Sequence, residues 1–426
     1  MQAIVLVLRG CPAGWLGAYG NEWVATPNLD RFAAGALIFD QHISDCPTTE
    51  AAHAAWRTGQ SQVPPMEDAE LPRPTWDVIA ELGRAGVRTV LVHANHPDTD
   101  VRGFEEIWSE VVEARPQAED GSPLDELTRQ FPTLLERLGR ESPWLLWIEI
   151  DRLLPPWDIP QDVFEAYLDD SDEDETPPTT SDAEESEEED DDEDEPVAVE
   201  PIEPVTPWSD PPVGPFDTSD LDAWEWLHSS FAAVVTTLDA ELGRLLERLK
   251  DSGHADSTAV LLTSDFGWPL GEHGAIGPHR PRLHEELIHL PLLLRLPGAL
   301  PRHVPTFTQP ADLAPTLAEL LGVKVGEGIS GKSLLPLARG EVQEVRPYAI
   351  SGLCMEGEAE WALRTPEWAF LLPHATEEEE TGRTPALYVK PDDRWEVHDV
   401  RSLHLDWVEQ ATQLLREVTK VAPTGS

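Results

Sequence analysis

The sequence predicts an α/β fold with a mostly parallel central sheet, helices on both faces and a small C-terminal α+β subdomain. Short, continuous apolar runs at 3–8, 88–93, 144–150 and 258–264 are typical of strands buried on both faces. Amphipathic stretches separate these runs, and such alternation favours parallel strands joined by crossover helices. The carboxyl ends of the strands should therefore form the ligand site.

The predicted helices carry local signals at their ends. The segment 26–36 begins with Thr26 and Pro27, and proline is favoured in the first turn of a helix. The longest amphipathic segment, 221–253, ends at a glycine. Its apolar residues recur at three- and four-residue spacing and should pack as one stripe on the sheet. The stripe comprises Trp224, Leu227, Phe231, Val234, Val235, Leu238, Leu242 and Leu245.

Composition divides the chain into parts. Residues 1–340 carry the alternating pattern of strands and helices, whereas 341–426 change to short strand-like pieces and a terminal helix, which predicts a small C-terminal subdomain. Residues 169–206 consist mainly of Asp, Glu, Ser, Thr and Pro. Such a segment cannot bury enough apolar surface to fold, so we expect a disordered acidic insertion in the first domain.

The charge balance limits the class of partner. The 426 residues contain 81 Asp and Glu but only 30 Lys and Arg, which gives a formal net charge of −51. Nucleic acid and anionic membrane surfaces attract basic proteins, so neither is an expected partner. A basic protein could bind residues 169–204, and the sequence identifies no other partner.

The sequence also predicts a cytoplasmic location. Three cysteines form no disulfide framework and fit a reducing compartment. The apolar start MQAIVLVL lacks a basic region before it and a cleavage site after it, so it is interpreted as a strand rather than a signal peptide. No apolar run reaches the roughly 18 residues that a membrane span requires.

Several blocks of the sequence, in the right order, resemble the sulfatase family of the alkaline-phosphatase-like fold. Two of them are LGAYGNEWVATPNLDRFAAGALIFDQ (16–41) and TSDFGWPLGEHGAIG (263–277). Similar blocks follow at 284–298, 312–341 and 386–400. The resemblance implies a divalent cation, usually calcium, held by oxygen ligands at the ends of two strands. It also implies a formylglycine nucleophile made from Cys or Ser, and basic groups that bind sulfate.

The residues at the cation positions of the family differ in this chain. The two aspartates that follow the first strand fall on Arg9 and Gly10, which cannot hold a cation. Asp265 is retained at the second metal turn, but the His or Asn after it is Phe266. We therefore expect no cofactor, with Ca²⁺ bound only if other residues complete a functional site.

The nucleophile position of the family falls on Thr49, within SDCPTTEAAHAAWRTGQ (44–60). Thr cannot become formylglycine, but related phosphoryl-transferring branches use it, and His53 matches a variant of their loop. Thr49 could instead be the N-cap of a helix. Cys46 would need a shift of three residues and lacks the Pro-Ser-Arg context that formylglycine maturation needs.

Two further groups belong to the resemblance. The lysine that would contact the sulfate falls on Pro278, and Arg280 or Arg282 could replace it as a substrate-binding residue. His273, in the Gly-Glu-His-Gly turn, is either catalytic or structural.

These departures predict a pseudoenzyme that keeps a binding or regulatory role without hydrolase activity. Two alternatives stay open: a metal-dependent sulfuric- or phosphoric-ester hydrolase or transferase using Thr49, and an interaction protein acting through its acidic insertion. The sequence also predicts that Arg9 pairs with Asp265 through two parallel hydrogen bonds, which places a positive charge where the cation would stand. Phe266 should fill the space of a lost ligand.

Overall fold

A computed structural model describes most of the chain. The described residues are 1–66, 71, 73–94, 104–116, 121–140, 143–168, 205–278, 282–355, 357–375 and 383–420. The acidic stretch 169–204 lies outside them, as does Arg280, so the predictions made for these residues stay predictions.

The central sheet has the strand order β11-β2-β10-β7-β1-β5-β3-β4, and β9 pairs with β2. These strands are β1 (Gln2–Leu8), β2 (Leu37–Ile43), β3 (Arg88–Ala94), β4 (Glu110–Glu113), β5 (Trp144–Ile150), β7 (Thr258–Thr263), β9 (His289–Leu290), β10 (Leu292–Arg295) and β11 (Arg302–Thr308). Strand β10 runs antiparallel to β7 and β2, and β9 runs antiparallel to β2, whereas the other pairs are parallel. The prediction of one mostly parallel sheet is confirmed.

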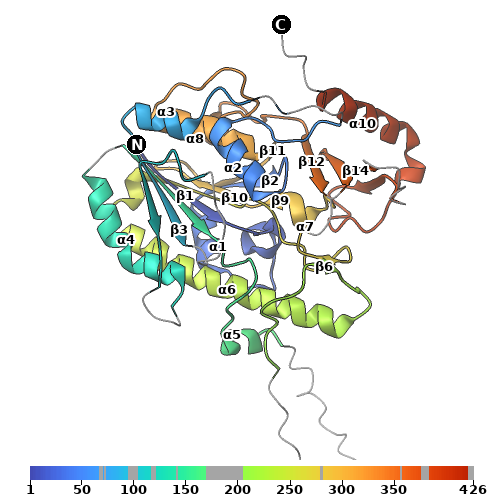
Figure 1. Ribbon diagram of the computed structural model, residues 1–426, viewed down its shortest axis with the longest axis horizontal. Helices are drawn as coiled ribbons and strands as arrows, with labels where there is room; N and C mark the ends of the chain where they lie inside the picture. Colours follow the sequence, from blue (N-terminus) through green and yellow to red (C-terminus); the bar gives the residue numbers. More distant parts are fainter. Residues whose placement is uncertain are drawn as a thin grey trace, which may run out of the picture.

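Helices cover both faces of this sheet (Figure 1). One layer contains α1 (Pro27–Ala33), α4 (Pro123–Gly139) and α6 (Leu221–Asp251), and the other contains α2 (Thr49–Thr58), α3 (Val78–Arg84) and α8 (Leu313–Leu321). The shorter helices are α5 (Gln161–Glu165), α7 (Glu285–Ile288) and α9 (Leu335–Arg339). Each layer encloses its own cluster of buried apolar side chains, which explains why the strands are apolar on both faces.

The apolar stripe of α6 is buried as predicted, with one exception. Seven of its eight residues are buried, but Trp224 is 37% exposed and stacks on His228 at 3.6 Å between ring centroids. The prediction is wrong for this residue because the first turn of α6 extends beyond the sheet (Figure 1). A ring–ring contact there replaces burial in the core.

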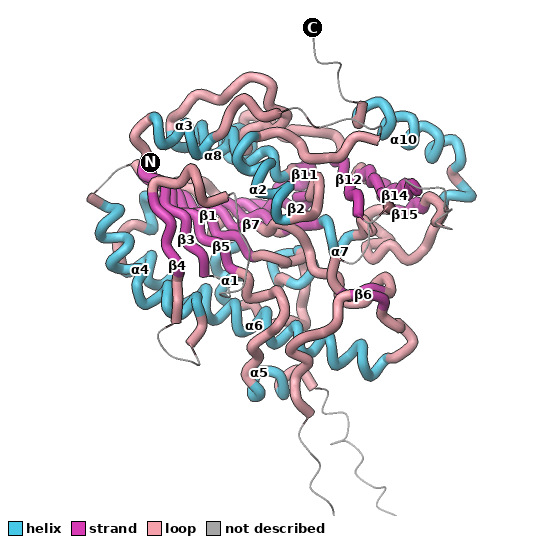
Figure 2. Tube along the Cα trace, viewed as in Figure 1, coloured by secondary structure: helices cyan, strands magenta, loops and turns pink. Residues whose placement is uncertain are grey.

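The C-terminal part forms a second, antiparallel sheet with the order β12-β13-β14-β15. Its elements are β12 (Ala349–Met355), β13 (Glu358–Arg364), β14 (Trp368–Ala375), β15 (Ala386–Val389) and the helix α10 (Leu405–Val418). A separate two-stranded pair joins β6 (Gly214–Pro215) and β8 (Ala275–Ile276). Figure 2 shows the second sheet beside the β2 and β11 side of the central sheet. None of the described helices is long and apolar enough to span a bilayer.

Candidate functional site

Three segments bring the predicted reaction centre together at the carboxyl edge of the central sheet. Strands β1 and β7 are parallel neighbours, so Arg9, just after β1, and Asp265, just after β7, end side by side. Thr49 is the first residue of α2. The hydroxyl of Thr48, not that of Thr49, caps this helix by accepting a hydrogen bond from the Ala51 N–H. The Thr49 hydroxyl is therefore free to face the strand ends, and the N-cap alternative for it is wrong.

The Thr49 hydroxyl lies between a carboxylate and a guanidinium. Its Oγ1 donates to Asp265 Oδ2 at 2.7 Å and accepts a hydrogen bond from Arg9 Nη2 at 3.1 Å. Arg9 Nε lies 3.4 Å from Asp265 Oδ2, so the predicted ion pair is confirmed. The prediction of two parallel hydrogen bonds is wrong, because Arg9 Nη2 donates to Thr49 instead of to the second oxygen of the Asp265 carboxylate.

The residues at this position do not fit a divalent cation. Asp265 Oδ1 accepts hydrogen bonds from the backbone N–H groups of Gly10 at 3.0 Å and Phe266 at 2.9 Å, and Oδ2 serves Thr49 and Arg9. The guanidinium charge would repel a cation, and the buried ring of Phe266 offers it no oxygen. Across the described part of the chain, no three His, Cys, Asp or Glu side chains gather as a metal site.

A buried histidine–glutamate pair lies next to this centre. His53 stands one turn after Thr49 on α2, so the two side chains share a face of the helix. Its Nε2 lies 2.7 Å from Oε1 of Glu149, a fully buried residue near the end of β5, and its ring stacks on Phe104. Burial raises the pKa of Glu149, but the charges of His53, His93 and Arg9 outweigh burial and hold that pKa below its ordinary value.

Sequence reasoning missed Glu149 because it interprets WLLWIEI as a buried strand. The available signal was a lone carboxylate at the second-to-last position of that strand. An ionisable group there lies at the carboxyl edge of a parallel sheet, where ligand sites form.

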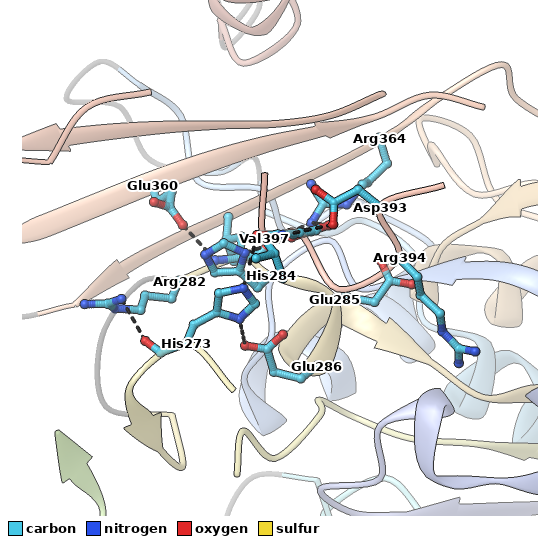
Figure 3. Close-up of polar contacts among 12 residues, drawn as sticks. His273, Arg282, His284, Glu285, Glu286, Glu360, Arg364, Asp393, Arg394 and Val397 are labelled. Carbon is cyan, nitrogen blue, oxygen red and sulfur yellow. Dashed lines mark hydrogen bonds and ion pairs between the residues drawn. The ribbon is translucent and has the colours of Figure 1, made fainter. Parts of the chain in front are cut away.

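His273 and Arg282 lie in a different cluster and contact none of Thr49, Arg9 or Asp265. His273 Nδ1 contacts Glu286 Oε1 at 2.7 Å, and its ring stacks on His284 at 3.6 Å between centroids (Figure 3). Arg282 Nη1 donates to the His273 carbonyl oxygen at 3.0 Å. Burial lowers the pKa of His273, but the hydrogen bond and charge of Glu286 and the charge of Glu396 raise it to about 9. These contacts fit the structural alternative for the turn.

The fold and this arrangement define an α/β protein of the alkaline-phosphatase-like class, with its polar centre at the carboxyl edge of the central sheet. The Sulfatase family model matches residues 11–323, and the chain belongs to the sulfatase family.

Named relatives agree with this assignment over parts of their length. The chain is 34% identical over 125 residues to an N-acetylglucosamine-6-O-sulfatase of Bacteroides thetaiotaomicron, which covers 28% of this chain and 22% of that protein. It is 27% identical over 199 residues to arylsulfatase K of Danio rerio, covering 45% of this chain and 37% of that protein. The chain therefore aligns with well under half the length of either relative.

Two solved structures show the same fold. One, described as a complex with its substrate D-glucosamine-2-N,6-O-disulfate, has a TM-score of 0.70 at 18% identity and covers 98% of this chain and 97% of its own. The other, a phosphonate monoester hydrolase of Agrobacterium radiobacter, has a TM-score of 0.68 at 19% identity, with 98% and 96% covered.

The comparisons contradict the prediction of a pseudoenzyme. Both relatives described above are named sulfatases, so the prediction of a protein confined to a binding or regulatory role is wrong. That prediction rested on the residues at the cation, nucleophile and sulfate positions of the family. A hydroxyl, a carboxylate and a fixed guanidinium meet at the same edge of the sheet.

Proposed function

We propose that this protein is a sulfuric ester hydrolase whose reaction centre consists of Thr49, Asp265 and Arg9. One observation carries the proposal: the Thr49 hydroxyl donates to a buried carboxylate at 2.7 Å while a guanidinium donates to it at 3.1 Å. Membership of the sulfatase family supports sulfuric esters as the substrate class. Thr49 itself is only partly buried.

Arg9 would bind the sulfate group and take the electrostatic role that a cation has elsewhere. It is 6% exposed, and its Nη1 has no hydrogen-bond partner among the described residues. A buried donor without a partner is costly, and a sulfate oxygen would satisfy it. Its fixed charge would also offset the negative charge on the sulfuryl oxygens as the ester bond breaks.

The chemical step needs only groups that are in place. As Asp265 accepts the Thr49 proton, the Thr49 oxygen attacks the sulfur, and the bond from sulfur to the ester oxygen breaks with its electron pair on the leaving alkoxide. The alkoxide takes up a proton to become the alcohol. Water then attacks the sulfur of the sulfated Thr49 and gives one proton to His53, while Asp265 returns its proton to the Thr49 oxygen, which releases hydrogen sulfate and restores the hydroxyl.

His53 would supply the proton to the leaving alkoxide. Its Nε2 is held by Glu149, while its Nδ1 makes no hydrogen bond to any described residue. A carboxylate that holds one ring nitrogen orients the imidazole and stabilises its protonated form, which is how a histidine becomes an effective acid. Thr49 and His53 share a face of α2, so the proton would be released next to the reacting sulfur.

Turnover of 4-nitrophenyl sulfate by wild type and Thr49→Ala tests the proposal. We expect the substitution to lower kcat/KM about a thousandfold or more, as loss of a nucleophile does. Thr237→Ala is a matched control, because that hydroxyl bonds only the Ala233 carbonyl within α6 and should leave turnover unchanged. No turnover by wild-type protein of aryl or alkyl sulfates, or equal turnover by Thr49→Ala, would refute the reaction centre.

The leaving group separates the role of His53 from that of Thr49. A nitrophenolate leaves without a proton, whereas an alkoxide needs one. His53→Gln should therefore reduce kcat far more for an alkyl sulfate than for 4-nitrophenyl sulfate. Equal losses for both substrates would mean that His53 only supports the fold.

A further inference from the structure

A second polar cleft lies at the seam between the central sheet and the C-terminal sheet. It has a volume of about 480 Å³ and is lined by residues of η2 (Gly17–Tyr19), β2, β11 and the segments that follow β13 and β15. None of its lining residues belongs to the Thr49 centre. The cleft therefore carries an inference independent of the proposed function.

Three cations line this cleft in a chain that is strongly acidic. They are Arg364, Lys390 and Arg394. Lys390 donates hydrogen bonds to Glu285 Oε2 at 3.0 Å and to the Arg394 carbonyl oxygen at 2.9 Å, and it forms an ion pair with Glu396 Oε1 at 3.0 Å. Two carboxylates therefore already balance its charge.

The two arginines have guanidinium donors without a partner among the described residues. Arg364 is 3% exposed, and its Nη2 serves Glu396 and the Leu283 carbonyl, but its Nε and Nη1 have no partner among the described residues. Arg394 donates to the Tyr19 carbonyl oxygen at 3.2 Å and lies over the Trp395 ring. No carboxylate of the described chain pairs with Arg394. Figure 3 shows Arg394 beside Glu285, with its guanidinium group directed away from Arg364.

The carboxylates of the cleft are already paired. Glu285 contacts Lys390 and His289, and Asp40 contacts His303 at 2.7 Å. An incoming cation would therefore find no free carboxylate, whereas an incoming anion would find the remaining guanidinium donors of Arg394. The positive charges of Arg364 and Arg394 would stabilise a bound anion there.

We propose that this cleft binds a small organic anion, with a sulfate, sulfonate or carboxylate group on Arg394 and the buried charge of Arg364 nearby. The rest of the lining explains why the ligand is organic. Tyr19, Pro305, Phe307 and Pro391 contribute apolar walls, and a pocket of apolar walls with a few fixed polar groups is typical of small-molecule sites. An inorganic ion would leave those walls uncovered.

Isothermal titration of the full chain with 4-toluenesulfonate tests this proposal, since the sulfonate cannot be hydrolysed. We expect saturable binding that Arg394→Gln weakens about tenfold, the value of one charge-assisted hydrogen bond. Arg394→Lys should recover part of the affinity, which separates charge from packing. Arg31→Gln, an exposed arginine of α1 that bonds Asn28, is the control and should bind as wild type does.

Four outcomes would overturn the proposal: loss of binding in Thr49→Ala, no saturable binding, equal affinity in Arg394→Gln, or inorganic sulfate binding as tightly as 4-toluenesulfonate. The last would show that the apolar walls contribute nothing. Thr49→Ala should keep the affinity of the cleft, and loss of binding in that variant would place the ligand at the reaction centre instead. A failure here leaves the hydrolase proposal standing, because turnover by Thr49 does not depend on Arg394.

Discussion

Two buried clusters of this protein set an arginine against a carboxylate, but they surround that carboxylate differently. Asp265 faces one guanidinium at 3.4 Å and takes its shorter hydrogen bonds from a hydroxyl and two backbone N–H groups. Glu396 faces two cationic side chains, Arg364 at 2.8 Å and Lys390 at 3.0 Å, and the imidazole of His284 at 2.8 Å.

On the proposed function, the difference separates a reactive carboxylate, Asp265, from a structural one, Glu396. Burial raises the pKa of Glu396, but the charge of Arg364, the hydrogen bond from His284 and the charge of Lys390 lower it to about 2. A carboxylate so held stays ionised and serves as a counter-ion. Asp265 instead accepts the proton-bearing hydroxyl of Thr49, which is the arrangement that a base needs.

Removing the charge of Glu396 should have the largest effect on stability. Glu396→Gln leaves the positive charges of Arg364 and Lys390 uncompensated in the interior, so we expect a loss of about 5 kcal/mol. Denaturant unfolding measures it. Glu341→Gln, an exposed residue 3.7 Å from Arg339, should change stability by less than about 0.5 kcal/mol. Similar losses in both variants would mean that the cluster is not structural.

Asp265→Asn should cost less, about 3 kcal/mol, because a single guanidinium loses its partner. The double variant Arg9→Met with Asp265→Asn also removes the unpaired guanidinium charge. It should therefore regain part of the stability that Asp265→Asn alone loses. The free energy of unfolding measures both. A double variant less stable than either single variant would contradict the view that the ion pair holds this edge together.

The pH dependence of stability should come mainly from the cluster around Glu396, which includes His273. The pKa of His273 is raised from its ordinary 6.5 to about 9, so its paired charge stabilises the fold fully below pH 6.5 and is lost as the pH rises through 9. We expect a decrease of about 2 kcal/mol over this window. His273→Gln should flatten the profile there, and an unchanged slope would refute the assignment.

Calcium should have the smallest effect of all. If only the folded state bound a cation, a free cation concentration of 100 times its Kd would raise the free energy of unfolding by about 2.7 kcal/mol. We expect instead that neither Ca²⁺ nor EDTA changes the thermal midpoint of unfolding. The physical reason is that Arg9 already supplies positive charge to Asp265. If Ca²⁺ raised the thermal midpoint and Asp265→Asn abolished that rise, a cation would replace the Arg9 guanidinium beside Asp265.

Much of the fold could be predicted because each local pattern has few solutions. Apolar runs such as AIVLVL form strands that are buried on both faces, and the stripe of α6 packs on the sheet. The pairing of Arg9 with Asp265 could be predicted as well, because both residues follow strands whose ends meet. Trp224 shows the limit: its spacing fits the stripe, but the end of the sheet, which is a tertiary feature, leaves it exposed.

By itself the sequence determined the strands, the helices and the identities of the residues at the edge of the sheet, because periodicity and residue order act locally. Only the tertiary structure decided which groups meet: Arg9 Nη2 turns to Thr49, Glu149 receives His53, and Arg364 and Arg394 line one cleft although 29 intervening positions separate them. Hydrogen-bond geometry is fixed to within a few tenths of an ångström, and that precision comes from packing between distant segments rather than from any local pattern.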